Sequence, residues 1–131
     1  MENNFEKVKS YLTELGHNIS FQDVENQLLV INDESSGIYN LVFGCADPIL
    51  IMEQNMFDIS PNNTDVFKSL LKKNRDIVHG AFVLNEEGNK VIFRDTLQLE
   101  NLDLNEIEGS INSLGLLLSE YSNELINFSK K

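Results

Sequence analysis

An unbroken apolar seam near the C-terminal end of the chain constrains the possible fold most. Its members alternate at spacings of three and four residues, the period of one helix face: Leu104, Ile107, Ile111, Leu114, Leu118, Tyr121, Leu125 and Phe128. Asp103 is placed to cap this helix, with Glu106 three residues on as in a capping box. One apolar face along a long helix needs a sheet or a second helix to cover it, and the strand patterns described below favour a sheet.

The rest of the chain changes period several times. Residues 5–15 are apolar at helical spacing, and Gly16 follows as a natural end. Residues 17–59 contain strand formers separated by turns, which predicts an antiparallel meander of three or four strands. A second helix follows the capping residues at 60–64. Residues 80–85 and 90–99 read as two further strands around a turn at Gly88.

We therefore predict one α+β domain spanning residues 1–131. It is an antiparallel β-sheet of about five strands with helices packed on it, in the order α-β-β-β-α-β-β-α. A chain of 131 residues with 41% apolar residues has the size and composition of one ordinary domain.

Charge and cysteine content limit the possible partners and compartments. The net charge of −11 repels phosphate, so we expect neither nucleic acid nor a membrane surface as a partner. Apolar runs such as 28–31 and 49–52 are too short to cross a bilayer, and residues 1–4 lack the features of a signal peptide. Cys45 is the single cysteine, which excludes an internal disulfide. A cytoplasmic location is expected.

The chain carries no convincing catalytic or metal-binding motif. One cysteine with His17 and His79 does not supply a zinc site. The spacing of Asn101, Asp103 and Asn105 resembles a calcium loop only superficially, because the sixth position is glutamate rather than glycine. A Cys45–His79 thiol dyad is a combination that any such pair would allow. We predict no catalytic residue, no cofactor and no metal, and hence no enzyme.

The stretch KKNRDIVHGAF, residues 72–82, carries the densest positive charge. Lys72, Lys73 and Arg75 fall in the last turn of the second predicted helix, where cations oppose the negative end of the helix dipole. A helix end explains the cluster without a ligand. A basic patch for an acidic partner, or for the acidic half of a second subunit, is the alternative that stays open.

The block from residue 70 to residue 121 resembles the second half of the YbjN and type III secretion chaperone group, also known as CesT or Tir chaperones. The positions that carry this resemblance are Leu70, Leu71, Asn74, Gly80, Ala81, Leu84, Gly88 and Val91. The resemblance implies a helix–sheet–helix sandwich that usually dimerises. It also implies a small, acidic, cytoplasmic chaperone that binds an extended segment of a client protein without ATP.

The resemblance supplies two sets of expected contact residues. Client contacts are expected at Phe5, Val8, Tyr11, Leu12 and Phe21, although the four helix residues would equally suit an ordinary core. Contacts of a homodimer are expected at Phe67, Leu70, Leu71, Ile51, Met52 and Met56. The alternatives are a YbjN-like regulator that binds a folded partner and a small enzyme with a deep pocket around His79 or Cys45.

Overall fold

The computed structural model describes residues 3–130, which form three helices and one antiparallel sheet of six strands. The helices are α1 (Asn4–Glu14), α2 (Thr64–Asn74) and α3 (Leu104–Ser129). The strands are β1 (Ile19–Asp23), β2 (Leu28–Asp33), β3 (Ile38–Ala46), β4 (Ile49–Asp58), β5 (Ala81–Leu84) and β6 (Lys90–Gln98), with a short 3-10 turn, η1 (Glu34–Ser36), before β3. This confirms the α+β class and the antiparallel sheet.

The sheet order is β1-β2-β3-β4-β6-β5, so β1 and β5 are its edge strands. The first half of the chain supplies four strands, the higher of the two numbers predicted, so the sheet has six strands in place of the expected five or so. Residues 19–33 contribute two of these strands, β1 and β2, as a short antiparallel hairpin.

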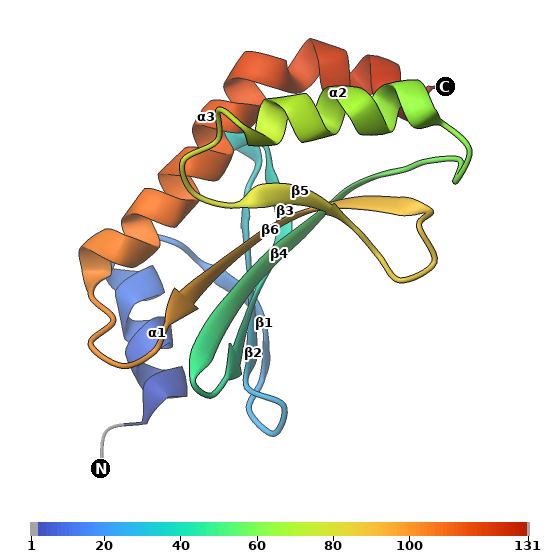
Figure 1. The fold of residues 1–131 in the computed structure, drawn as a ribbon. Helices are drawn as coiled ribbons and strands as arrows, with labels where there is room; N and C mark the ends of the chain where they lie inside the picture. Colours follow the sequence, from blue (N-terminus) through green and yellow to red (C-terminus); the bar gives the residue numbers. More distant parts are fainter. Residues whose placement is uncertain (1–2, 131) are drawn as a thin grey trace.

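One face of the sheet carries the core. Strand residues with nearly complete burial alternate with partly exposed ones, as a sheet covered on one side requires. The buried side chains of this face include Leu29, Ile31, Leu41, Phe43, Leu50, Met52, Val91 and Phe93. The helices gather on one side of the sheet, where α3 starts near α1 and its C-terminal half lies beside α2 (Figure 1). The apolar seam of α3 thus covers a sheet.

The start of α3 is fixed by the predicted capping box. The backbone N–H of Glu106 donates to Asp103 Oδ1 over 2.8 Å, and the N–H of Asp103 donates to Glu106 Oε1 over 3.3 Å. Two backbone donors that have no partner inside the helix are satisfied by this exchange. The weak resemblance of this segment to a calcium loop is therefore explained by capping.

The two shorter helices attach to opposite ends of α3. On α1, the Tyr11 hydroxyl donates to the carbonyl oxygen of Leu102, 3.2 Å away, just before α3 begins. On α2, Lys73 Nζ lies 2.9 Å from Glu124 Oε2 and 4.7 Å from the centre of the Tyr121 ring. Part of the basic cluster is therefore used to hold α2 against α3.

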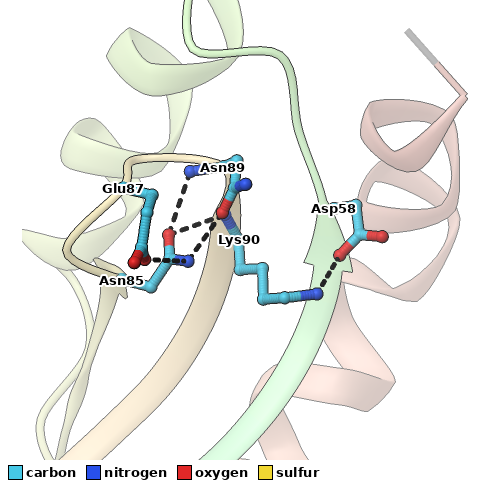
Figure 2. A network of polar contacts seen from close by, with 5 residues as sticks. All are labelled: Asp58, Asn85, Glu87, Asn89 and Lys90. Atoms are coloured by element: carbon cyan, nitrogen blue, oxygen red, sulfur yellow. Dashed lines mark hydrogen bonds and ion pairs between the residues drawn. The ribbon is translucent and has the colours of Figure 1, made fainter.

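The turn between β5 and β6 is organised by one asparagine. Figure 2 shows the Asn85 side chain inside the turn, where its Oδ1 accepts the N–H groups of Asn89 and Lys90, both over 2.9 Å. Gly88 has a φ of 73°, the positive value that the sequence predicted for this turn. Lys90 Nζ then reaches Asp58 Oδ1, 2.8 Å away, and ties the hairpin to the end of β4.

Candidate functional site

Most of the expected client-binding residues of α1 lie inside the protein. Phe5, Val8 and Leu12 are almost fully buried and face the sheet, and Tyr11 is partly buried through its contact with Leu102. An α1 that offered these side chains to a client would first have to leave the core. Phe21 differs, because 55% of it is exposed on the edge strand β1.

The residues expected at a dimer interface fall on three separate surfaces. Ile51 lies on the open face of the sheet and is partly exposed, whereas Met52 is fully buried on the covered face. Consecutive strand residues point to opposite faces, which is why these two separate. On α2, Leu70 is buried while Leu71 is 70% exposed.

The other two dimer candidates, Phe67 and Met56, are partly buried against the core, and Met56 lines a groove on the helix side of the sheet. The structure therefore does not bring the six predicted residues together into one patch.

This groove has a volume of about 1050 Å³. Its walls are one flank of α3, from the apolar seam to the solvent side, the start of β3 with the preceding η1 turn, and the end of β4. Ile38, Met56, Leu118 and Leu125 contribute apolar side chains to the lining. Leu116 and Ile126, exposed at 70% and 52%, also line it and present apolar surface directly to solvent.

The buried polar side chain in the floor of the groove is already hydrogen bonded. Gln54 is almost fully buried, and its Oε1 accepts the N–H of Tyr39 over 3.2 Å while its Nε2 donates to the carbonyl oxygen of Gly37 over 3.3 Å. At one end, hydroxyl donation from Ser35 and Ser36 lowers the pKa of Asp33, with a smaller contribution from the charge of His17. Within residues 3–130, no buried side-chain nitrogen or oxygen lacks a hydrogen-bond partner, so the buried floor of the groove holds no unpaired polar side chain.

The face of the sheet away from the helices forms a second apolar surface, called here the open sheet face. Val30, Val42 and Ile51 lie on it in neighbouring strands and are partly exposed, and Phe21 stands across from Val30 at its edge. The charged pair on this face is Glu53 and Arg94, whose Oε1 and Nη1 atoms are 3.6 Å apart. A hollow of about 200 Å³ beside Ile51 includes Cys45, and burial raises the pKa of that thiol.

The residues considered for catalysis are not gathered in the groove, whose lining contains neither His79 nor Cys45. The carbonyl oxygen of His79 accepts a hydrogen bond from Ser113 Oγ over 2.9 Å, which ties the joint before β5 to α3. Within residues 3–130, no three His, Cys, Asp or Glu side chains are grouped so that they could hold a metal ion. None of the helices in that range has the length and apolar character needed to cross a bilayer.

The groove was not predicted from the sequence. The α3 seam explains the residues on the covered side, whereas Leu116 lies off that seam. Such an apolar residue outside the seam of an amphipathic helix indicates exposed apolar surface, so Leu116 could have pointed to one wall of the groove. The other wall, around Tyr39, could not be found from sequence, because it meets α3 only after the strands have paired.

Comparisons with known proteins agree on one fold. The model of the CesT_Tir_1 family matches residues 1–131. No curated protein matches the chain by sequence. The solved structure of YbjN from E. coli, described as a candidate transcription regulator, has a TM-score of 0.68 at 11% identity and covers 92% of both chains.

Two complexes also superimpose on this chain. The structure of the ExsC–ExsE complex has a TM-score of 0.68 at 16% identity, covering 95% of this chain and 97% of the other. The Yersinia pestis type III secretion chaperone SycH, in complex with a stable fragment of YscM2, has a TM-score of 0.59 at 12% identity, covering 97% and 100%. At these identities the likeness shows a shared fold.

Proposed function

The chain belongs to the CesT_Tir_1 family, and from this premise we propose that it is a non-catalytic module that binds an extended segment of a client protein as a homodimer. Proteins of the same fold have been solved in complex with protein partners, among them SycH with a fragment of YscM2. The proposal rests on the family together with one feature of this chain, the apolar groove along α3.

The groove supports protein binding for a physical reason. Leu116 and Ile126 leave apolar area in water on the outer side of a helix whose inner side already fills the core. Contiguous exposed apolar area of this kind marks interaction sites on soluble proteins. A volume of about 1050 Å³ accommodates several apolar side chains of a partner segment.

The edge of the sheet supports the extended form of the client. The groove ends at His17, two residues before β1, and β1 is an edge strand. A segment that leaves the groove at this end can continue as an added strand, whose backbone bonds to the free edge of β1. Phe21, exposed on β1, then offers an apolar contact to the added strand.

The open sheet face supports the homodimer. Val42 and Ile51 supply apolar area on neighbouring strands, and Glu53 and Arg94 offer charges of opposite sign. In a twofold pair, the glutamate of one copy can face the arginine of the other, because such an interface is self-complementary. We place the contact around Ile51, which belongs to the set expected from the sequence.

A non-catalytic role is supported by the chemistry of the groove. Its floor has Gln54 with both its amide oxygen and its amide nitrogen hydrogen bonded. The carboxylate of Asp33, at one end of the groove, already accepts the hydroxyls of Ser35 and Ser36.

The client proposal is tested by charging the groove. The chain and its Leu116→Glu/Ile126→Glu variant are used as bait in the lysate of the native host, and a Leu84→Glu variant serves as control. Leu84 is 44% exposed on β5 and does not line the groove. We expect one protein to bind the wild type and the control but not the groove variant, and a synthetic segment of that protein to reproduce this pattern in calorimetry. Equal binding to all three forms contradicts the groove as the client site.

The homodimer is tested by light scattering at micromolar concentration. The wild type should have the mass of two chains, and Val42→Lys/Ile51→Lys should have the mass of one, because buried unpaired charges oppose association. A monomeric wild type contradicts the dimer. A Leu71→Lys variant that is monomeric, while the sheet variant stays dimeric, would move the contact to α2.

A second candidate is a regulator that binds a folded partner, favoured by the match to YbjN. The state of the recovered partner separates the two functions. A client segment binds as an isolated peptide, whereas a folded partner loses binding when it is unfolded or cut into peptides.

A further inference from the structure

We propose that the outer side of α2 binds an acidic, partly apolar segment of another protein, at a patch formed by Lys68, Leu71, Lys72 and Arg75. This patch, called here the α2 patch, is separate from the groove and from the open sheet face. It therefore adds a second recognition surface to the function proposed above.

The distribution of charge is the first observation. Residues 64–76 contain four of the ten basic residues of the chain but only two of its 21 acidic residues. The cations are thus concentrated on one helix of a protein whose net charge is −11. Lys68, Lys72 and Arg75 are all exposed at a spacing of three and four residues, so they share one side of α2.

The structure shows which of these cations are already engaged. Lys73 points to α3, where it pairs with Glu124 and lies over two aromatic rings. The three ion pairs found within residues 3–130 do not include Lys68, Lys72 or Arg75. The inner cation therefore has a structural role, whereas the outer three present their charge to solvent.

Capping of the helix end does not account for the whole patch. The dipole of a helix acts on charges within its last turn. Lys72 and Arg75 fall at that end, but Lys68 lies a turn earlier on the same side. Leu71, 70% exposed between these cations, has no role in capping, and Val78, 85% exposed, follows in the joint before β5.

The chemistry of the patch selects the partner. Lys68 and Arg75 are seven residues apart, about 10 Å along a helix. This is close to the screening length at physiological salt, so the patch acts locally despite the acidic remainder of the protein. A short segment with two or three carboxylates and an apolar side chain over Leu71 matches it. DNA or an anionic membrane extends well beyond the patch and would meet the repelling acidic surface.

Two variants with equal change of charge test the proposal. Lys68→Glu/Lys72→Glu alters the α2 patch, and Lys7→Glu/Lys9→Glu makes the same change on α1. The probe is a fluorescent amphipathic helical peptide of glutamate, leucine and alanine, about 15 residues long so that it can form a helix. We expect binding by the wild type and the α1 variant, weakened about tenfold in the α2 variant, and weakened further as salt is raised.

Four outcomes would overturn the proposal. Equal weakening in both variants means that only the overall field acts. Tight binding of a DNA duplex or of phosphatidylserine vesicles through the α2 patch, with none of the peptide, means that phosphate is the ligand. A peptide that binds no form means that the patch has no acidic partner, and a patch variant that becomes monomeric means that a second copy of the chain covers it.

Binding of the acidic peptide at the α2 patch can be distinguished from binding of the client in the groove. The Leu116→Glu/Ile126→Glu variant should keep the acidic peptide, and Lys68→Glu/Lys72→Glu should keep the client. Thermal unfolding of each variant checks that it is folded, which is expected because the exchanged side chains are at the surface.

Discussion

The side-chain amide of Asn74, the last residue of α2, makes two hydrogen bonds with the backbone of Phe82 on β5. Asn74 Oδ1 accepts the N–H of Phe82 over 2.8 Å, and Asn74 Nδ2 donates to its carbonyl oxygen over 3.1 Å. The end of the helix is thereby fastened to the edge strand β5. Together with the hydrogen bond from Ser113 to the carbonyl oxygen of His79, this amide holds the charged stretch against the rest of the fold.

Replacing Asn74 with alanine should lower the free energy of unfolding by about 1–3 kcal/mol, because it leaves the partly buried N–H and C=O of Phe82 without partners. Urea denaturation measures this difference. Asn105→Ala, at an exposed position of α3, is the matched control and should change stability by less than about 0.5 kcal/mol. An Asn74 variant as stable as the control would show that water replaces the amide at no cost.

Gly80→Ala should be far more costly than Gly88→Ala. Both glycines have positive φ, at 89° and 73°. A Cβ on Gly80 would collide with the ring of Phe93, 2.8 Å from Cε2, and lie 3.1 Å from the carbonyl oxygen of Arg94, whereas a Cβ on Gly88 meets nothing within 4 Å. We expect a loss of about 1 kcal/mol for Gly88→Ala, and about 2–4 kcal/mol for Gly80→Ala. Equal melting temperatures of the two variants would contradict the collision.

Lys73→Ala should destabilise the protein by about 1 kcal/mol, since it removes the pair with Glu124 and the contact with the Tyr121 ring. Lys72→Ala, on the outer side of α2, should change little. A double-mutant cycle with Glu124→Ala isolates the ion pair, and its coupling energy should fall as salt is raised. A coupling near zero would leave the aromatic rings as the main partners of Lys73.

The pKa of Asp33 should rise when its hydroxyl donors are removed. Ser35 Oγ and Ser36 Oγ donate to its carboxylate over 2.7 Å and 3.0 Å, and they hold its pKa below the usual 3.8. A carboxyl group with a lowered folded pKa stabilises the folded state above the unfolded pKa, and this contribution is lost as the pH falls through the folded pKa. NMR titration of Ser35→Ala/Ser36→Ala should show a higher pKa for Asp33, while Ser20→Ala should leave it unchanged.

Several parts of the fold follow from local chemistry and were predicted from the sequence. The capping box at Asp103 and the positive φ of Gly88 depend on side chains only a few residues apart, so their pattern is visible in the chain. The class and the family were also predicted, because the positions from Leu70 to Val91 keep their spacing. The number of strands was less certain, because a short hairpin and a single longer strand have similar composition.

The contact surfaces show where this reasoning stops. The sequence determined that α1 and α3 each have an apolar side, because helical periodicity is a local property. It did not determine that Phe5, Val8 and Leu12 would be buried in the core, because their burial depends on which face of the sheet the helices cover. Only the tertiary structure decided that Leu116 borders a groove, that Ile51 and Met52 serve opposite faces, and that Lys73 turns inward while Lys72 stays in water. Each of these outcomes joins residues far apart in the chain, and such contacts exist only once the sheet and helices have packed.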